Sequence, residues 1–87
     1  MNTGKLYDED DHFLVDVSYR TFSQSGDRWS GELIPEEYTP ITDGDGYVIE
    51  LDDGRKSRCS LRKQINLPVS SVPPRYHYAV RGYEWVE

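Results

Sequence analysis

The chain has 87 residues and a formal net charge of −6, and only 36% of its residues are hydrophobic. This length predicts a single domain, residues 1–87, and aromatic side chains, 13% of the residues, must supply much of its core. No apolar run could span a membrane and the acidic N-terminus does not resemble a signal peptide, so we expect a cytoplasmic protein with no membrane partner.

The first predicted strand covers residues 12–22, where apolar and polar residues alternate with the period of a half-buried strand. Its expected inner face consists of Phe13, Val15, Val17 and Tyr19. Residues 1–11, which precede it, are rich in acids. We expect them to form a loosely ordered N-terminal segment.

A turn over residues 23–27 leads to a second alternating stretch, residues 28–34. It places Trp29 and Leu33 on one face. Gly31 lies between them, where a glycine in a strand indicates a bulge or a close approach of another backbone.

Residues 35–46 contain two prolines and two Asp-Gly pairs, which predict a loop with one helical turn starting at Pro35. The sequence DGDG over residues 43–46 partly matches a calcium-binding loop. Its first ligand position is Ile41, however, and its last is Asp52 instead of a bidentate glutamate. Turn chemistry explains the Asp-Gly pairs, so we predict no metal site.

Residues 47–61 predict a hairpin whose register depends on the turn. A two-residue turn at Asp53 and Gly54 would mix apolar and charged side chains on one face. A three-residue loop over 52–54, with Gly54 left-handed, keeps the apolar side chains together. It pairs Ile49 with Ser57, Tyr47 with Cys59 and Glu50 with Lys56, and its buried face is Tyr47, Ile49, Leu51, Cys59 and Leu61.

Residues 65–75 hold three prolines and predict an extended crossing segment. Residues 76–86 then form the last predicted strand, with Tyr76, Tyr78 and Val80 on one face. A bulge at Arg81 and Gly82 would let Tyr83 and Trp85 continue that face.

About five short strands with almost no helix indicate an all-β fold, a small and strongly curved antiparallel barrel. An SH3-like barrel is our first choice, and an OB-like or split barrel is the second.

No catalytic constellation is visible. His12 and His77 lack a nucleophile at a suitable spacing, no glycine-rich phosphate loop follows a strand, and the single Cys59 is expected to be a small core residue. We therefore predict a protein that is not an enzyme and has no cofactor.

Charge is divided along the chain. Residues 1–54 carry fourteen acids and three bases, a balance of −11, whereas residues 55–87 carry two acids and seven bases, a balance of +5. The basic run 55–63, with tyrosines nearby in sequence, allows single-stranded nucleic-acid binding as the alternative function.

Against the nucleic-acid alternative, the acids before Gly54 should neutralise Arg55, Lys56 and Arg58. Arg62, expected opposite residue 44, and Lys63 would remain available.

The favoured prediction is a protein-interaction module or adaptor, because Tyr, Trp and Arg dominate the energetics of protein interfaces. Not all eleven aromatic side chains should fit inside so small a barrel. The predicted partner-binding residues are Arg58, Arg62, Lys63, Trp29, Tyr83 and Trp85. The partner would be another protein, and a homodimer is also compatible with the division of charge.

Overall fold

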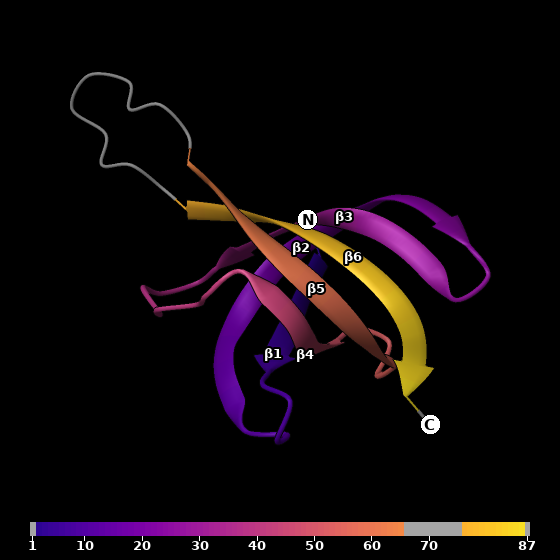
Figure 1. Cartoon of the computed structure of the whole chain (residues 1–87), viewed down its shortest axis with the longest axis horizontal. Coiled ribbons are helices and arrows are strands. Elements are labelled where there is room, and N and C mark those ends of the chain that lie inside the picture. Colours follow the sequence, from indigo (N-terminus) through magenta and orange to yellow (C-terminus); the bar gives the residue numbers. More distant parts are fainter. Residues whose placement is uncertain (1, 66–75, 87) are drawn as a thin grey trace.

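The structure, a computed structural model, describes residues 2–65 and 76–86 (Figure 1). Its six strands are β1 (Asn2–Tyr7), β2 (Phe13–Ser25), β3 (Arg28–Pro35), β4 (Gly44–Glu50), β5 (Lys56–Ile65) and β6 (Tyr76–Val86). They form a closed barrel in the order β1-β2-β3-β6-β5-β4, with every neighbouring pair antiparallel. The predicted small antiparallel barrel is confirmed, with six strands instead of five. No helix in the described residues is long and apolar enough to cross a bilayer.

The additional strand is β1, which pairs with β2 on one side and with β4 on the other and so closes the barrel. The prediction that residues 1–11 are loosely ordered was therefore wrong for residues 2–7. Leu6 is the only buried side chain of β1. The sequence of this strand therefore lacks the alternation of apolar and polar residues that would have predicted it. Gly4 is needed for the close pairing, because a Cβ there would lie 2.4 Å from the carbonyl oxygen of Glu50.

Strand β2 buries Val15, Val17 and Tyr19 as predicted, but Phe13 is 52% exposed. A register shift near the end of β1 pairs Phe13 with Tyr7, and the two rings meet edge to face at 5.9 Å. Alternation therefore fails at the first residue of the strand, where the barrel wall is irregular.

The β2–β3 hairpin is longer than predicted, because Ser25 still pairs with Arg28 and the turn shrinks to two residues. Gly31 marks a close backbone approach, as expected, since a Cβ there would lie 2.2 Å from the carbonyl oxygen of Arg20. The bulge itself lies on the partner strand β2, where Phe22 is the extra residue.

The predicted helical turn at Pro35 is absent from the structure, because Pro35 is the last residue of β3 and pairs with Val17. Ile41, in the connection to β4, packs into the core.

The register of the β4–β5 hairpin is confirmed: Ile49 pairs with Ser57, Tyr47 with Cys59 and Glu50 with Lys56. Gly54 has a φ of 89°, which is the left-handed conformation that the three-residue loop requires. Beyond Tyr47 the register shifts, so Gly44 pairs with Leu61 and not with Arg62 as predicted. The register predicted from the turn therefore does not extend past the shift at residues 45 and 46.

Strand β6 buries Tyr78 and Val80. A bulge is present one residue later than predicted: Gly82 pairs with Cys59 and Glu84 with Arg58, leaving Tyr83 as the extra residue. Trp85 returns to the inner face and packs against the core, whereas Tyr83 lies on the outer face. Apart from Ile65, the predicted crossing segment 65–75 lies outside the described residues.

The core contains a buried hydrogen bond between Trp29 and Ser57. Trp29 is only 4% exposed, and its indole Nε1 donates a hydrogen bond of 2.9 Å to Ser57 Oγ. Gly82 lies beneath this indole, and a Cβ there would be 1.8 Å from Nε1. Cys59 is confirmed as a core residue, and burial raises the pKa of its thiol to about 12.

Candidate interaction surface

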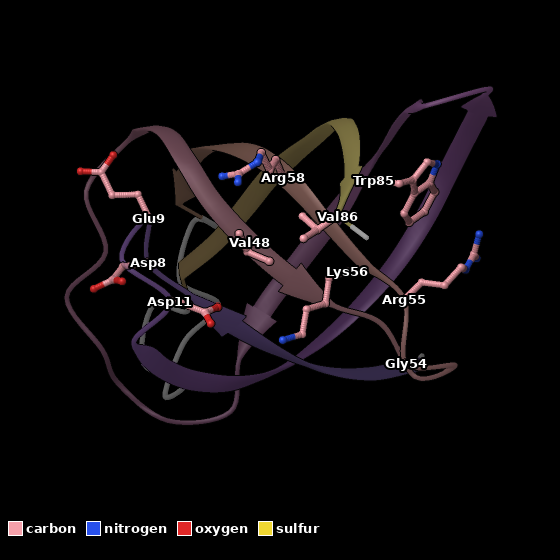
Figure 2. A pocket seen from close by; sticks show the side chains of 10 residues that line it. All are labelled: Asp8, Glu9, Asp11, Val48, Gly54, Arg55, Lys56, Arg58, Trp85 and Val86. Atoms are coloured by element: carbon pink, nitrogen blue, oxygen red, sulfur yellow. The ribbon is translucent and has the colours of Figure 1, made fainter.

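A groove of about 700 Å³ lies along β4, β5 and β6, between these strands and the β1–β2 loop, and reaches Trp85. We call it the Trp85 groove. In Figure 2 acidic side chains from the loop lie at one end, and Trp85 with Arg55 lies at the other. The groove is lined by Asp8, Glu9, Asp11, Val48, Gly54, Arg55, Lys56, Arg58, Trp85 and Val86.

Trp85 and Arg55 form the aromatic end of this groove. The guanidinium of Arg55 lies over the indole ring at 4.5 Å, a cation–π contact. Asp53 holds that guanidinium, since Arg55 Nε donates to Asp53 Oδ2 at 2.7 Å. Hydrogen bonds from the backbone N–H and side chain of Arg55 lower the pKa of Asp53. The Arg55 side chain is therefore positioned by a carboxylate on one side and a ring on the other.

The middle of the groove has an apolar floor, Val48 and Val86, and the cations Lys56 and Arg58 border it. Lys56 Nζ lies 5.0 Å from the ring centre of Tyr7, whose hydroxyl donates to Glu50 Oε1. That hydrogen bond raises the pKa of Tyr7.

Arg58 Nε lies 3.6 Å from Glu84 Oε1. The basic run is thus partly neutralised, as we expected. Asp53, one of the acids before Gly54, pairs with Arg55 as predicted, but the carboxylate that pairs with Arg58 is Glu84 of β6.

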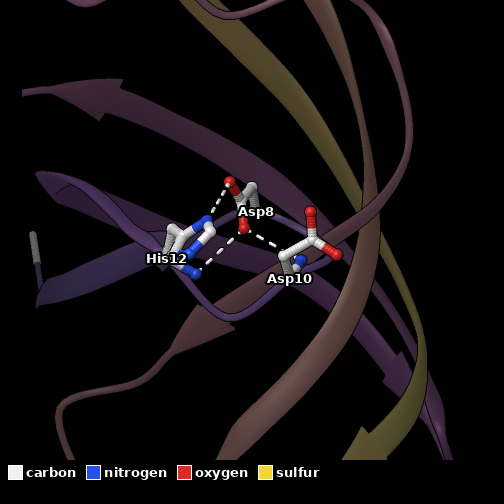
Figure 3. A group of neighbouring side chains, drawn as sticks. All are labelled: Asp8, Asp10 and His12. Atoms are coloured by element: carbon white, nitrogen blue, oxygen red, sulfur yellow. Dashed lines mark hydrogen bonds and ion pairs between the residues drawn. The ribbon is translucent and has the colours of Figure 1, made fainter.

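The acidic end belongs to the β1–β2 loop, which Asp8 organises (Figure 3). Asp8 Oδ1 accepts hydrogen bonds of 2.9 Å from the backbone N–H groups of Asp10 and His12, and Oδ2 lies 3.4 Å from His12 Nδ1. The His12 N–H bond is the main cause of the lowered pKa of Asp8. Potential ligand atoms of Asp8, Asp10 and His12 lie within 4.8 Å of one another, but these loop contacts account for their proximity.

Two other acids of the loop, Glu9 and Asp11, line the Trp85 groove. Neither makes an ion pair with any residue that the structure describes. They therefore remain available to a cationic group of a ligand, at the opposite end from Trp85.

A second groove, of about 580 Å³, lies further along the outer side of β5 and β6. Arg62 and Arg81 line it together with Ser60 and Ala79, and we call these four residues the arginine face. The remaining lining residues are Asp43, Gly44, Asp45, Leu61 and Gln64.

A hydrogen bond marks the border between the two grooves. The Tyr83 hydroxyl donates to Asp45 Oδ1, which raises the pKa of Tyr83. Tyr83 is on β6 and Asp45 on β4, so this contact crosses the intervening strand β5. By register, the crossing falls between Arg58, in the Trp85 groove, and Arg62, in the second groove.

The structure separates the six predicted partner-binding residues. Arg58 and Trp85 line the Trp85 groove, Arg62 lines the second groove, and Tyr83 lies on the border. Lys63 follows Arg62 on the same strand, so their side chains leave it on opposite sides and do not form one patch.

Trp29 was wrongly expected to be exposed. Its indole faces inward, where Ser57 satisfies the N–H and Gly82 provides the space.

Sequence reasoning missed Arg81 and the two acids of the Trp85 groove, Glu9 and Asp11. Glu9 and Asp11 reach the groove only because β1 pairs with β4, and no local pattern showed that pairing. Arg81 had a usable signal, since it alternates with the buried Val80 and must face outward.

No protein-family model, curated protein or solved structure matches this chain. Function is therefore inferred from the geometry of the two grooves alone.

Proposed function

We propose that the protein is a non-enzymatic interaction module, an SH3-like small barrel of the cytoplasm, that binds a segment of another protein in the Trp85 groove. The observation that supports this most is the arrangement at Trp85: a half-buried indole, covered on one face by Arg55, beside an apolar floor. Tryptophan and arginine are the residue types that most often dominate binding energy at protein interfaces.

The charges around the floor indicate what such a segment would carry. Glu9 and Asp11 at one end favour a basic side chain, and Val48 and Val86 in the middle favour an apolar one. An acidic or carbonyl group would meet Lys56 and Arg58 at the cationic border. A peptide can present all three kinds of group within a few residues, which supports a protein as the ligand.

Single-stranded nucleic acid, the alternative, is supported less well. Two of the cations of the Trp85 groove already face carboxylates, Arg55 with Asp53 and Arg58 with Glu84. The acids of the β1–β2 loop and the net charge of −6 both oppose a polyphosphate chain. Trp85 also has one face occupied by Arg55, which leaves less ring surface for stacking a base.

Affinity purification from a lysate of the source organism, with and without nuclease, tests the proposal. The immobilised wild-type chain should retain the same polypeptide in both arms, and Trp85→Ala should lose it. Trp85 also packs on the core, so its loss could weaken the fold as well as binding. Arg55→Ser is therefore a second variant, because the Arg55 side chain is exposed and its loss should leave the fold intact. Phe22→Ala is the matched control, since this aromatic is 62% exposed and lies outside the groove.

Titration of the purified partner then measures the effect. Loss of the Trp85 indole should weaken binding about thirtyfold or more, the range of an interface hot spot at about 2 kcal/mol. Retention that disappears on nuclease treatment, or that Phe22→Ala reduces as much as Trp85→Ala and Arg55→Ser do, would reject the proposal. Sedimentation of the chain alone shows whether the partner is a second copy.

A further inference from the structure

The arginine face carries two cations that have no carboxylate partner among the described residues. Arg62 and Arg81 are both exposed, and neither makes an ion pair within residues 2–65 and 76–86. Their strand neighbours Leu61 and Val80 are buried, so both arginine side chains leave the barrel wall on its outer side. This differs from the Trp85 groove, where Arg55 and Arg58 already face carboxylates.

The acids that line the same groove are engaged elsewhere. Asp43 Oδ1 accepts a hydrogen bond of 2.7 Å from the backbone N–H of Lys63. Asp45 Oδ1 accepts from the backbone N–H of Gly46 and from the Tyr83 hydroxyl. These carboxylates hold the loop and the tyrosine in place, and neither guanidinium donates a hydrogen bond to another described side chain, so both can donate to a ligand.

The register fixes the spacing of the two arginines. Arg62 pairs with Ala79, and Arg81 pairs with Ser60, so the arginines are diagonal neighbours on adjacent antiparallel strands. Such diagonal positions are about 7–8 Å apart. Alternate residues of an extended chain are separated by about 6.6–6.8 Å and point to the same side.

We propose that the arginine face binds an extended acidic peptide that carries carboxylates at alternate positions, one on Arg62 and the other on Arg81. Each guanidinium can grip a carboxylate through two parallel N–H donors. Ala79 and Ser60 occupy the other two positions of this four-residue arrangement, and their small side chains leave room for a peptide backbone to pass. The proposal concerns a face that the Trp85 groove does not include, so each can fail without the other.

A peptide fits this face better than a nucleic-acid strand does. Asp43 and Asp45 lie along one side of the groove, and a strand with a phosphate at every nucleotide would bring further charges against them. A peptide with only two acidic residues can place uncharged groups there.

NMR titration of the isotope-labelled full chain tests the proposal with capped synthetic peptides. The probes are Gly-Glu-Ser-Glu-Gly, its diamide analogue with Gln for Glu, and Gly-Glu-Glu-Ser-Gly, whose carboxylates are adjacent. We expect the first peptide to shift the amides of residues 60–62 and 79–81 saturably, with about three- to tenfold higher affinity than the other two.

Arg62→Gln and Arg81→Gln should each reduce that affinity about three- to fivefold, as expected for exposed charge pairs. Arg28→Gln is the control, because Arg28 is another exposed arginine that lies outside both grooves. An equal affinity of the wild-type chain for all three peptides would overturn the proposal. So would an affinity of the Arg62 and Arg81 variants for the first peptide that equals that of the wild-type chain. Tighter binding of oligothymidylate at the same amides would replace the peptide with nucleic acid.

Discussion

The two sides of strand β5 place different demands on their residues. On the inner side Ser57, Cys59 and Leu61 are buried, and Ser57 accepts the indole N–H of Trp29. On the outer side Arg58 and Arg62 reach solvent and the two grooves. Since successive residues of a strand point in opposite directions, one segment supplies both the barrel wall and the candidate binding surface. Inner substitutions should therefore change stability, and outer ones should change binding.

The largest effect is expected from Gly82→Ala on β6, directly beneath Trp29. A Cβ at this position would lie 1.8 Å from the indole Nε1, so the ring must move and its hydrogen bond to Ser57 must break. Overpacking of this kind costs about 1–3 kcal/mol, and the lost hydrogen bond adds about 1 kcal/mol. Urea denaturation should show the midpoint falling accordingly.

Arg81→Ala is the matched control for that experiment. It changes the adjacent residue, whose side chain points outward, and should alter stability by less than about 0.5 kcal/mol. Equal midpoints for the two variants would contradict the distinction between the two sides of the wall.

Removing one hydroxyl from inside the barrel is expected to have the next largest effect. The buried Tyr19 hydroxyl accepts a hydrogen bond of 3.0 Å from the backbone N–H of Asp52 and donates one of 3.1 Å to Asp52 Oδ1. Burial raises the pKa of Tyr19, so the donor proton is present at neutral pH. Tyr19→Phe removes both bonds and should cost about 1–2 kcal/mol, measured by urea denaturation.

Tyr83→Phe repeats the same chemical change on the outer side, where the hydroxyl bonds the exposed Asp45. Water can replace that bond, so the loss should stay below about 0.5 kcal/mol. If the outer variant lost as much stability as Tyr19→Phe, the Tyr83 contact would be part of the structural framework and not a border between grooves.

Gly54→Ala tests the turn that sets the register of β5, with an intermediate effect. A Cβ at Gly54 would meet nothing within 4 Å, so its cost is conformational and not steric. A φ of 89° is unfavourable for alanine, and we expect a loss of about 1 kcal/mol in urea denaturation. Gly54→Asn should lose less, because asparagine tolerates the left-handed region. An unchanged midpoint for Gly54→Ala would show that the turn adapts without cost.

The β4–β5 hairpin could be predicted because its two candidate registers differ in which side chains they bury. A slip of one residue would have turned Ile49 toward water, so the sequence itself favoured one pairing. The barrel class followed from the same alternation in the other strands. Strand β1 could not be predicted, because a strand with one buried side chain has no period and depends on the ladders of its neighbours.

The candidate site was only partly predictable for a related reason. The outward direction of Arg58 and Arg62 followed from alternation, but the carboxylate that Arg58 meets depended on which strands lie side by side in space. Glu84 reaches Arg58 across the β5–β6 ladder, after the bulge at Tyr83 has shifted the register by one residue. Trp29 was misplaced because the space for its ring comes from Gly82, a residue on another strand.

The smallest effect should come from the ion pair of Asp53 and Arg55, whose side chains are 48% and 53% exposed. Hydrogen bonds from Arg55 lower the pKa of Asp53 below its ordinary value of 3.8. A carboxyl with a depressed folded-state pKa stabilises the fold above its unfolded-state value, and that contribution disappears as the pH falls through the folded-state value. Asp53→Asn should therefore flatten the acid limb of the stability curve slightly, measured as urea midpoints from neutral pH downward.

Arg55→Gln separates the two causes of this pH dependence. The backbone N–H of residue 55, which bonds Asp53 Oδ1 at 3.0 Å and is the larger cause, remains in that variant, while the side-chain donor to Oδ2 is replaced. Arg55→Gln should therefore flatten the acid limb less than Asp53→Asn does, although it removes the guanidinium that lies over the Trp85 ring. An acid limb equally flat in both variants would assign the stabilisation to the guanidinium, and the outer side of the hairpin would then contribute to stability through its charges as well as to binding.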